Sequence, residues 1–204
     1  MIVCLSKFDL LSQWITPFLS GAFVVVLAEI VRHRLFKPNL RIVFKEISAA
    51  YIARTKETYE AGKTREAYYV RVKVTNKSRI LARKCRAYLI NIEKRDNGRK
   101  FDPTVYRDSI QLAWSCQPPD YRYKGIDIPK GVNQFLDVVV TRQGLNEFDP
   151  QIIVKPYRYL DLFRETGEFR LTIQVYAAGA DPATLKLIFR WEGQWDKFTV
   201  TKEN

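Results

Sequence analysis

The stretch FRLTIQVYAAGADPATLKLIFRWE, from Phe169 to Glu192, decides the fold class. Apolar and polar residues alternate over Phe169–Tyr176 and again over Leu185–Glu192. Alternation with a period of two predicts strands that bury one face. Turn-forming residues at Gly179–Pro182 separate the two runs, so we expect an antiparallel hairpin.

Weaker versions of this pattern occur earlier in the chain. They predict strands near residues 40–47, 69–75, 85–95, 110–114, 135–140 and 151–156. The tripeptide Asp96-Asn97-Gly98 predicts a hairpin turn, whereas residues 53–66 lack a clear period and are expected to form a long loop or a short helix. Altogether, about seven to nine short strands predict a mainly β domain, an antiparallel β-sandwich, with a small closed β-barrel as the alternative.

The stretch LLSQWITPFLSGAFVVVLAEIV, residues 10–31, has a different character. At 1.5 Å per residue it would be about 33 Å long as a helix, close to the ~30 Å hydrocarbon core of a bilayer. It predicts a single transmembrane helix, with an anchor over residues 1–36 and a β domain over 37–204. A cleaved signal peptide is the alternative, which we disfavour because cleavage near Ser20–Ala22 would leave FVVVLA exposed on the mature protein.

Charge is divided unevenly along the chain. Residues 32–100 contain 20 Lys and Arg against 6 Asp and Glu, whereas residues 101–204 contain 13 against 14. The positive-inside rule then places the β domain on the cytoplasmic side of the inner membrane. Basic residues after the predicted span are expected to contact anionic lipids of the inner leaflet, and nucleic acid is the less favoured partner. These basic residues are Arg32, Arg34, Lys37 and Arg41. The alternative is a solvated sheet face, because basic residues alternate along the predicted strands at Arg71 and Lys73 and at Arg83, Lys84 and Arg86.

Motifs for catalysis are missing from the sequence. It contains no phosphate-binding glycine loop, no HExxH and no GxSxG, and its one histidine, His33, falls beside the predicted span. The three cysteines, Cys4, Cys85 and Cys116, have spacings that fit neither a disulfide framework nor a zinc site. We therefore expect a protein without enzymatic activity, cofactor or metal.

One aromatic and basic region is the candidate surface for a ligand or a protein partner. Arginine and aromatic side chains together suit stacking and protein contacts. The alternative is that Trp114 and a tyrosine cover the end of the sandwich while the charges are solvated. The candidate residues are Arg107, Trp114, Tyr121, Arg122, Tyr123 and Lys124.

Four segments carry a resemblance to a known group of proteins. They are VRVKVTNKSRILARKCRAYL (70–89), LAWS (112–115), IDIPKG (126–131) and FRWEGQWD (189–196). Over about residues 68–196 this pattern resembles uncharacterised bacterial single-pass membrane proteins with an immunoglobulin-like C-terminal domain. The resemblance implies an immunoglobulin-like sandwich and transfers no catalytic or binding residue. Cys85 and Cys116 do not have the spacing of antibody domains, so antibody-type function is not implied.

Three functions fit these observations. The first is a membrane-anchored, non-catalytic module for protein interaction or sensing at the cytoplasmic face. The second is a membrane effector that senses a small nucleotide-type ligand and forms homo-oligomers through its helix. The third is an extracytoplasmic envelope or adhesion module.

Overall fold

A computed structural model describes residues 23–30, 37–60, 62–95, 100–115 and 117–203. The chain divides into two compact units, Met1–Lys37 and Pro38–Asn204. Each unit is described by itself.

In the first unit, residues 23–30 form a helix of eight residues. The prediction of a transmembrane helix is wrong for the described residues: none of their helices is both long and apolar enough to cross a membrane. Residues 10–22 and 31 of the predicted span lie outside the described residues, as do Arg32 and Arg34.

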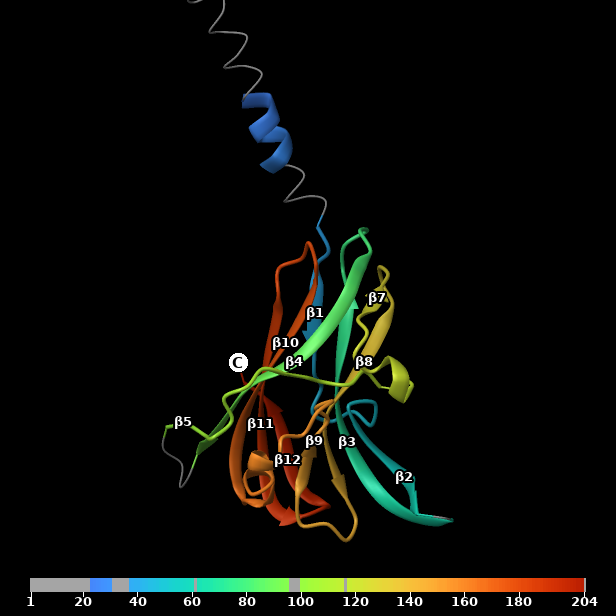
Figure 1. Cartoon of the computed structure of the whole chain (residues 1–204), viewed down its shortest axis with the longest axis vertical. Coiled ribbons are helices and arrows are strands. Elements are labelled where there is room, and N and C mark those ends of the chain that lie inside the picture. The colour runs from blue at the N-terminus through green and yellow to red at the C-terminus, as the bar shows by residue number, and fades with distance from the viewer. Residues whose placement is uncertain (1–22, 31–36, 61, 96–99, 116, 204) are drawn as a thin grey trace, which may run out of the picture. The chain divides into compact units, whose positions relative to one another are not determined.

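The second unit confirms the prediction of a mainly β domain (Figure 1). The described residues form twelve strands rather than seven to nine, because short segments of two or three residues also pair and because Ile52–Glu60, in a region expected to be a loop or short helix, forms a strand. One sheet has the order β1-β3-β8-β9, with β2 also paired to β3. The strands of this sheet are β1 (Leu40–Val43), β2 (Ile52–Glu60), β3 (Lys63–Asn76), β8 (Asn133–Arg142) and β9 (Phe148–Pro150).

The other sheet contains the hairpin predicted from the opening stretch. Its order is β12-β11-β10-β4-β5, and β6 and β7 also pair with β4. The register places Phe169 opposite Phe189 and Leu171 opposite Leu187. The strands of this sheet are β4 (Ala82–Arg95), β5 (Asp102–Pro103), β6 (Ile110–Gln111), β7 (Ile126–Ile128), β10 (Gly167–Ala178), β11 (Ala183–Gln194) and β12 (Lys197–Lys202). Three short 3-10 helices complete the domain: η1 (Pro119–Tyr121), η2 (Tyr157–Tyr159) and η3 (Leu162–Arg164).

Both sheets contribute their inner faces to one hydrophobic core. Val72 and Leu136 come from one sheet, and Leu89 and Ile173 come from the other; all four are buried. Burial of alternate residues explains why the period-two pattern identified these strands. The result is a sandwich-like arrangement of two antiparallel sheets.

On one side, the segment after β6 connects the two sheets. The Leu112 amide donates to the Ala87 carbonyl of β4 at 2.8 Å, and the Ser115 amide donates to the Phe135 carbonyl of β8 at 3.0 Å. Trp114 lies between them and forms a bridge with Leu136. This bridging segment carries the chain from one sheet to the other and buries Leu112 and Trp114 in the core.

Buried Asn76 holds the end of the domain where β4 begins. Its Nδ2 donates to the carbonyls of Ile80 and Ile128, at 2.6 and 3.1 Å, and its Oδ1 accepts from the amides of Asn39 and Ser78. Buried polar groups are tolerated when they are fully hydrogen-bonded in this way. Asn76 therefore fixes the β3–β4 loop, and with it the start of β4.

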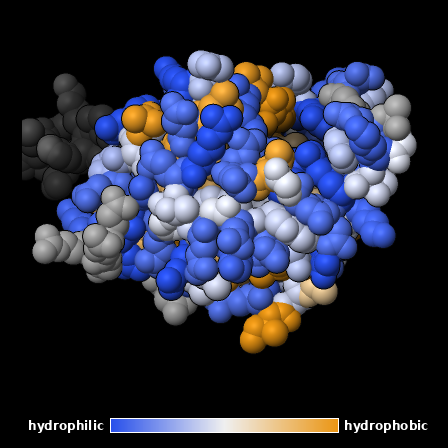
Figure 2. Space-filling view, turned by 90° about the horizontal axis from the view of Figure 1, so that it is seen from below, coloured by the Kyte–Doolittle hydropathy of each residue, from blue (hydrophilic) through white to orange (hydrophobic). Residues whose placement is uncertain are grey.

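Seen from the end opposite the start of β1, the domain surface is mostly hydrophilic (Figure 2). Apolar residues appear there in small, separate groups. Extensive protein interfaces are usually marked by larger contiguous apolar patches. This face of the domain has no such patch.

Candidate binding groove

The outer face of β4 carries an ordered row of side chains. Lys84, Arg86, Tyr88 and Ile90 point outward, while the alternate residues from Cys85 to Leu89 are buried. Strand geometry requires this alternation. The row therefore runs from two cations through an aromatic ring to an aliphatic side chain.

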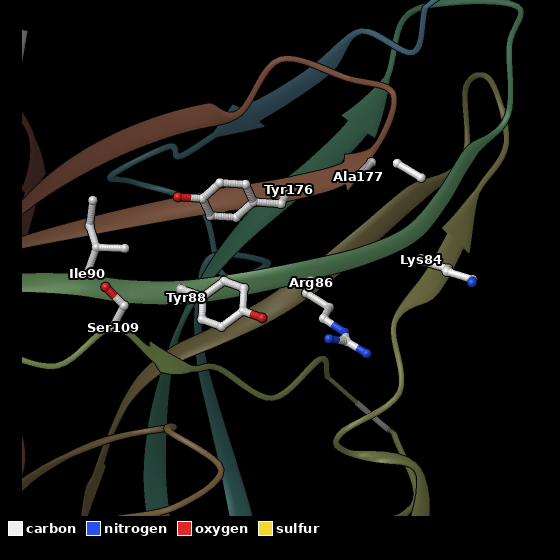
Figure 3. Close-up of a pocket in the computed structure, with 8 residues that line it drawn as sticks. Lys84, Arg86, Tyr88, Ile90, Ser109, Tyr176 and Ala177 are labelled. Carbon is white, nitrogen blue, oxygen red and sulfur yellow. The ribbon is translucent and has the colours of Figure 1, made fainter.

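This row lines a hollow of about 530 Å³ in the sheet surface (Figure 3). The end of β10 flanks this row on one side, and Ser109, in the segment before β6, flanks it on the other. Irregularities in the β4–β10 ladder lie at both ends of the hollow, between Thr172 and Ile173 and between Tyr176 and Ala178. Bulges bend a strand and increase its twist, which explains a depression on an otherwise regular sheet. We call this hollow the β4/β10 groove; it is lined by Lys84, Arg86, Tyr88, Ile90, Ser109, Tyr176, Ala177 and Ala178.

The backbone at Lys84 adopts a rare conformation. Its φ is +53°, the one positive φ of a non-glycine residue in the described parts of the chain. Left-handed geometry costs about 1–3 kcal/mol for such a residue and persists only where its surroundings enforce it. Here the Lys84 amide donates to Asp127 Oδ1 at 2.8 Å.

Close packing of Gly125 also holds the Lys84 backbone in this left-handed conformation. A Cβ added to Gly125 would lie 2.6 Å from the carbonyl carbon of Lys84 and 2.7 Å from its oxygen. Only glycine permits this approach of two backbones. The loop that ends at Gly125 is therefore packed directly against the cationic end of the groove.

The two cations of the groove are left without acidic partners. Within the described residues, neither the Lys84 ammonium nor the Arg86 guanidinium lies within ion-pair distance of a carboxylate. The neighbouring acid, Asp127, accepts the backbone amide of Lys84. Both cations thus remain available to an anion from outside.

Two tyrosines form the middle of the groove. The rings of Tyr88 and Tyr176 meet edge to face, with centroids 5.6 Å apart and planes at 80°. The Tyr176 hydroxyl donates to Gln174 Oε1, and the register places Tyr176 opposite Arg86. The rings offer a firm apolar surface beside the cations.

Four of the residues predicted for a partner surface lie in the loop beside this groove. Tyr121, Arg122, Tyr123 and Lys124 are all exposed. Gln111 of β6 donates from Nε2 to the Arg122 carbonyl at 3.1 Å, and the Lys124 ammonium lies 4.4 Å from the centre of the Tyr121 ring. Because Gln111 pairs with Tyr88, this loop flanks the groove on the side away from β10.

The other two predicted residues lie elsewhere. Trp114 is only 3% exposed, in the bridging segment, so it cannot contribute to a surface. The Arg107 amide donates to the Tyr159 hydroxyl at 3.4 Å. Arg107 lines a separate hollow of about 630 Å³ together with Leu162 and Glu165. The structure therefore divides the predicted surface.

Of the residues predicted to contact lipid, two can be located. Arg41 is exposed on β1, and Lys37 is partly buried at the end of the first unit. Their predicted role remains a prediction.

No catalytic arrangement emerges among the described residues. They contain no group of three or more His, Cys, Asp or Glu side chains that could hold a metal ion. Cys85 is fully buried, and burial raises the pKa of its thiol to about 11, which keeps it protonated and unreactive. His33 lies outside the described residues, so the expected absence of enzymatic activity stays a prediction.

Comparisons with known proteins do not identify this chain. No protein-family model matches it, and the curated proteins contain no detectable relative. The resemblance to single-pass proteins with an immunoglobulin-like domain therefore also remains a prediction.

Proposed function

We propose that the β domain is a non-catalytic interaction module that binds an acidic segment of a partner protein in the β4/β10 groove. The observation that carries this proposal is the pair of cations without carboxylate partners, Lys84 and Arg86, beside two tyrosines. Tyrosine and arginine are the residue types that dominate binding energy at protein interfaces. Charge complementarity selects an acidic partner and accelerates its association.

The length of the groove favours an extended segment. From Lys84 to Ile90 the strand advances six residues, or about 20 Å at 3.3 Å per residue. An extended peptide of about six or seven residues has the same length. An open hollow of about 530 Å³ along this length has room for one extended chain.

Peptide binding to the full-length protein tests the proposal. The probe is fluorescein-labelled hexaglutamate, with hexaglutamine as the neutral control, and the readout is fluorescence anisotropy. We expect Arg86→Ala to weaken hexaglutamate binding about tenfold, and added salt to weaken binding to the unaltered protein.

Arg190→Ala is the matched control. Arg190 is an exposed arginine on β11 of the same sheet, and its charge is balanced by Glu192 at 3.7 Å. Its loss should leave affinity within twofold. Equal losses in both variants would mean that binding follows net charge and would contradict the proposal, as would equal binding of the two peptides.

The volume of the groove favours a second candidate, a small anionic ligand with an aromatic ring. About 530 Å³ falls within the usual 300–1,000 Å³ of ligand sites. A cyclic nucleotide would place its phosphates at Lys84 and Arg86 and its base against the tyrosines. Thermal stabilisation by cyclic nucleotides that disappears in Arg86→Ala would favour this candidate, and no stabilisation would remove it.

A further inference from the structure

The β4/β10 groove has two chemically different ends. Along β4, the cations Lys84 and Arg86 come first, and Tyr88 and Ile90 follow. Figure 3 shows Lys84 and Ile90 at opposite ends, with Ser109 beside Ile90. The ends are six residues apart, so a bound segment would meet them with different residues.

A further cation belongs to the loop beside the first end. Lys124 directly precedes Gly125, whose backbone lies against that of Lys84. Asp127 is the acid of this end, and its Oδ1 accepts the Lys84 amide. Several carboxylates of a bound segment could therefore be neutralised here.

The second end of the groove has no cation among its lining residues. Ile90 is aliphatic, and Ser109 supplies a neutral hydroxyl. The next cations along this face are already paired, Arg170 with Glu93 and Arg95 with Glu168. A carboxylate placed beside Ile90 would lose water without gaining a counter-charge, which is unfavourable.

From this order, and building on the proposed function, we infer that the partner segment is bipartite: acidic residues at one end and an aromatic or aliphatic residue at the other. The acidic block binds at Lys84 and Arg86. The apolar residue lies against Tyr88 and Ile90, about four to six residues further along β4. Recognition thus depends on the order of acidic and apolar residues along the partner segment as well as on the total charge of that segment.

Three peptides test this inference on the full-length protein by fluorescence anisotropy. The first has a block of three glutamates followed by Gly, Leu and Phe. The second has the same composition with glutamates and apolar residues alternating, and the third is hexaglutamate. We expect the block peptide to bind about tenfold more tightly than the alternating peptide and at least as tightly as hexaglutamate.

Two substitutions then assign the ends. Tyr88→Ala should weaken the block peptide about fivefold and change hexaglutamate binding less than twofold. Arg86→Ala should weaken both peptides. Tyr157→Ala is the matched tyrosine control, because Tyr157 is 88% exposed and does not line the groove. Tyr88→Phe keeps the ring and should bind the block peptide like the unaltered protein.

The outcomes separate this inference from the proposed function. Equal binding of block and alternating peptides, or equal effects of Tyr88→Ala on block peptide and hexaglutamate, would overturn the bipartite segment and leave an acidic-segment module standing. Binding of none of the three peptides would overturn both.

Discussion

The outer face of β4 has two halves, and they differ in whether their cations are paired with carboxylates. In the second half, Arg170 binds Glu93 through two hydrogen bonds of 2.6 Å, and Arg95 binds Glu168 at 2.7 Å. Both guanidinium groups lie 4.6 Å from the centre of the Phe101 ring. In the first half, Lys84 and Arg86 have no carboxylate within ion-pair distance in the described parts of the chain.

If the groove binds a partner as proposed, this difference predicts that stability and binding depend on different halves of β4. The paired half has the bidentate geometry that makes ion pairs strong. The hydrogen bonds between Arg170 and Glu93 raise the pKa of the Arg170 guanidinium and lower the pKa of the Glu93 carboxyl. The first half carries backbone strain at Lys84 instead. We expect substitutions in the paired half to change folding and those at the groove cations to change binding.

The largest loss of unfolding free energy should come from Gly125→Ala. Its new Cβ would overlap the Lys84 backbone, and such overpacking should cost about 3 kcal/mol of unfolding free energy and disturb the groove as well. Urea unfolding followed by circular dichroism measures it. Lys124→Ala, in the same loop, should cost less than about 0.5 kcal/mol. Equal stabilities for the two variants would show that the close backbone approach is unimportant.

In the paired half, Glu93→Ala should lower the unfolding free energy by about 2 kcal/mol. It removes both hydrogen bonds to Arg170 and leaves that partly buried cation with Glu203 alone. Glu192→Ala breaks the exposed pair with Arg190 and should cost less than about 0.5 kcal/mol. A similar small cost for both would mean that the paired half does not stabilise the fold.

The pH dependence of the Arg170–Glu93 pair should change the unfolding free energy by a smaller amount. Because its folded pKa lies below the ordinary value of 4.5, Glu93 contributes its full stability above about pH 4.5 and loses it as the pH falls through the lowered value. The difference in unfolding free energy between the unaltered protein and Glu93→Gln should therefore shrink from pH 7 to pH 3. A difference that grows on acidification would have the wrong sign.

In the first half, strain at Lys84 can be measured by comparing Lys84→Gly with Lys84→Ala. Both remove the cation, and only glycine accepts the positive φ freely. We expect the glycine variant to be more stable than the alanine variant by about 0.8 kcal/mol in thermal and urea unfolding, after the entropy of the unfolded chain is included. Greater stability of the alanine variant would argue against a left-handed Lys84.

Sequence patterns predicted the long core strands well. β3, β10 and β11 alternate in sequence because every second side chain enters the core, as with Phe169 and Leu171. β2 was missed, and its region was predicted to be a loop or short helix. Its residues are mostly exposed on both faces, and it depends on pairing with β3, including an ion pair between Arg54 and Glu66, so no hydrophobic period marks it.

The groove could be predicted only in part. Alternation of basic residues around Lys84 and Arg86 indicated an exposed sheet face, and the structure agrees. Tyr176 comes from a strand ninety residues further along the chain, and the bulges that hollow the sheet depend on the register of β4 against β10. Neither is visible in local periodicity. Trp114 was a candidate for the partner surface, with burial at the end of the sandwich as the alternative, and the bridging segment turns it into the core.

The most direct test measures folding and binding together in Arg86→Ala. We predict an unfolding free energy within about 0.5 kcal/mol of the unaltered protein and an affinity for the block peptide reduced about tenfold. The opposite result, a clear loss of stability with unchanged peptide affinity, would show that Arg86 supports the fold and that the groove is not a binding site.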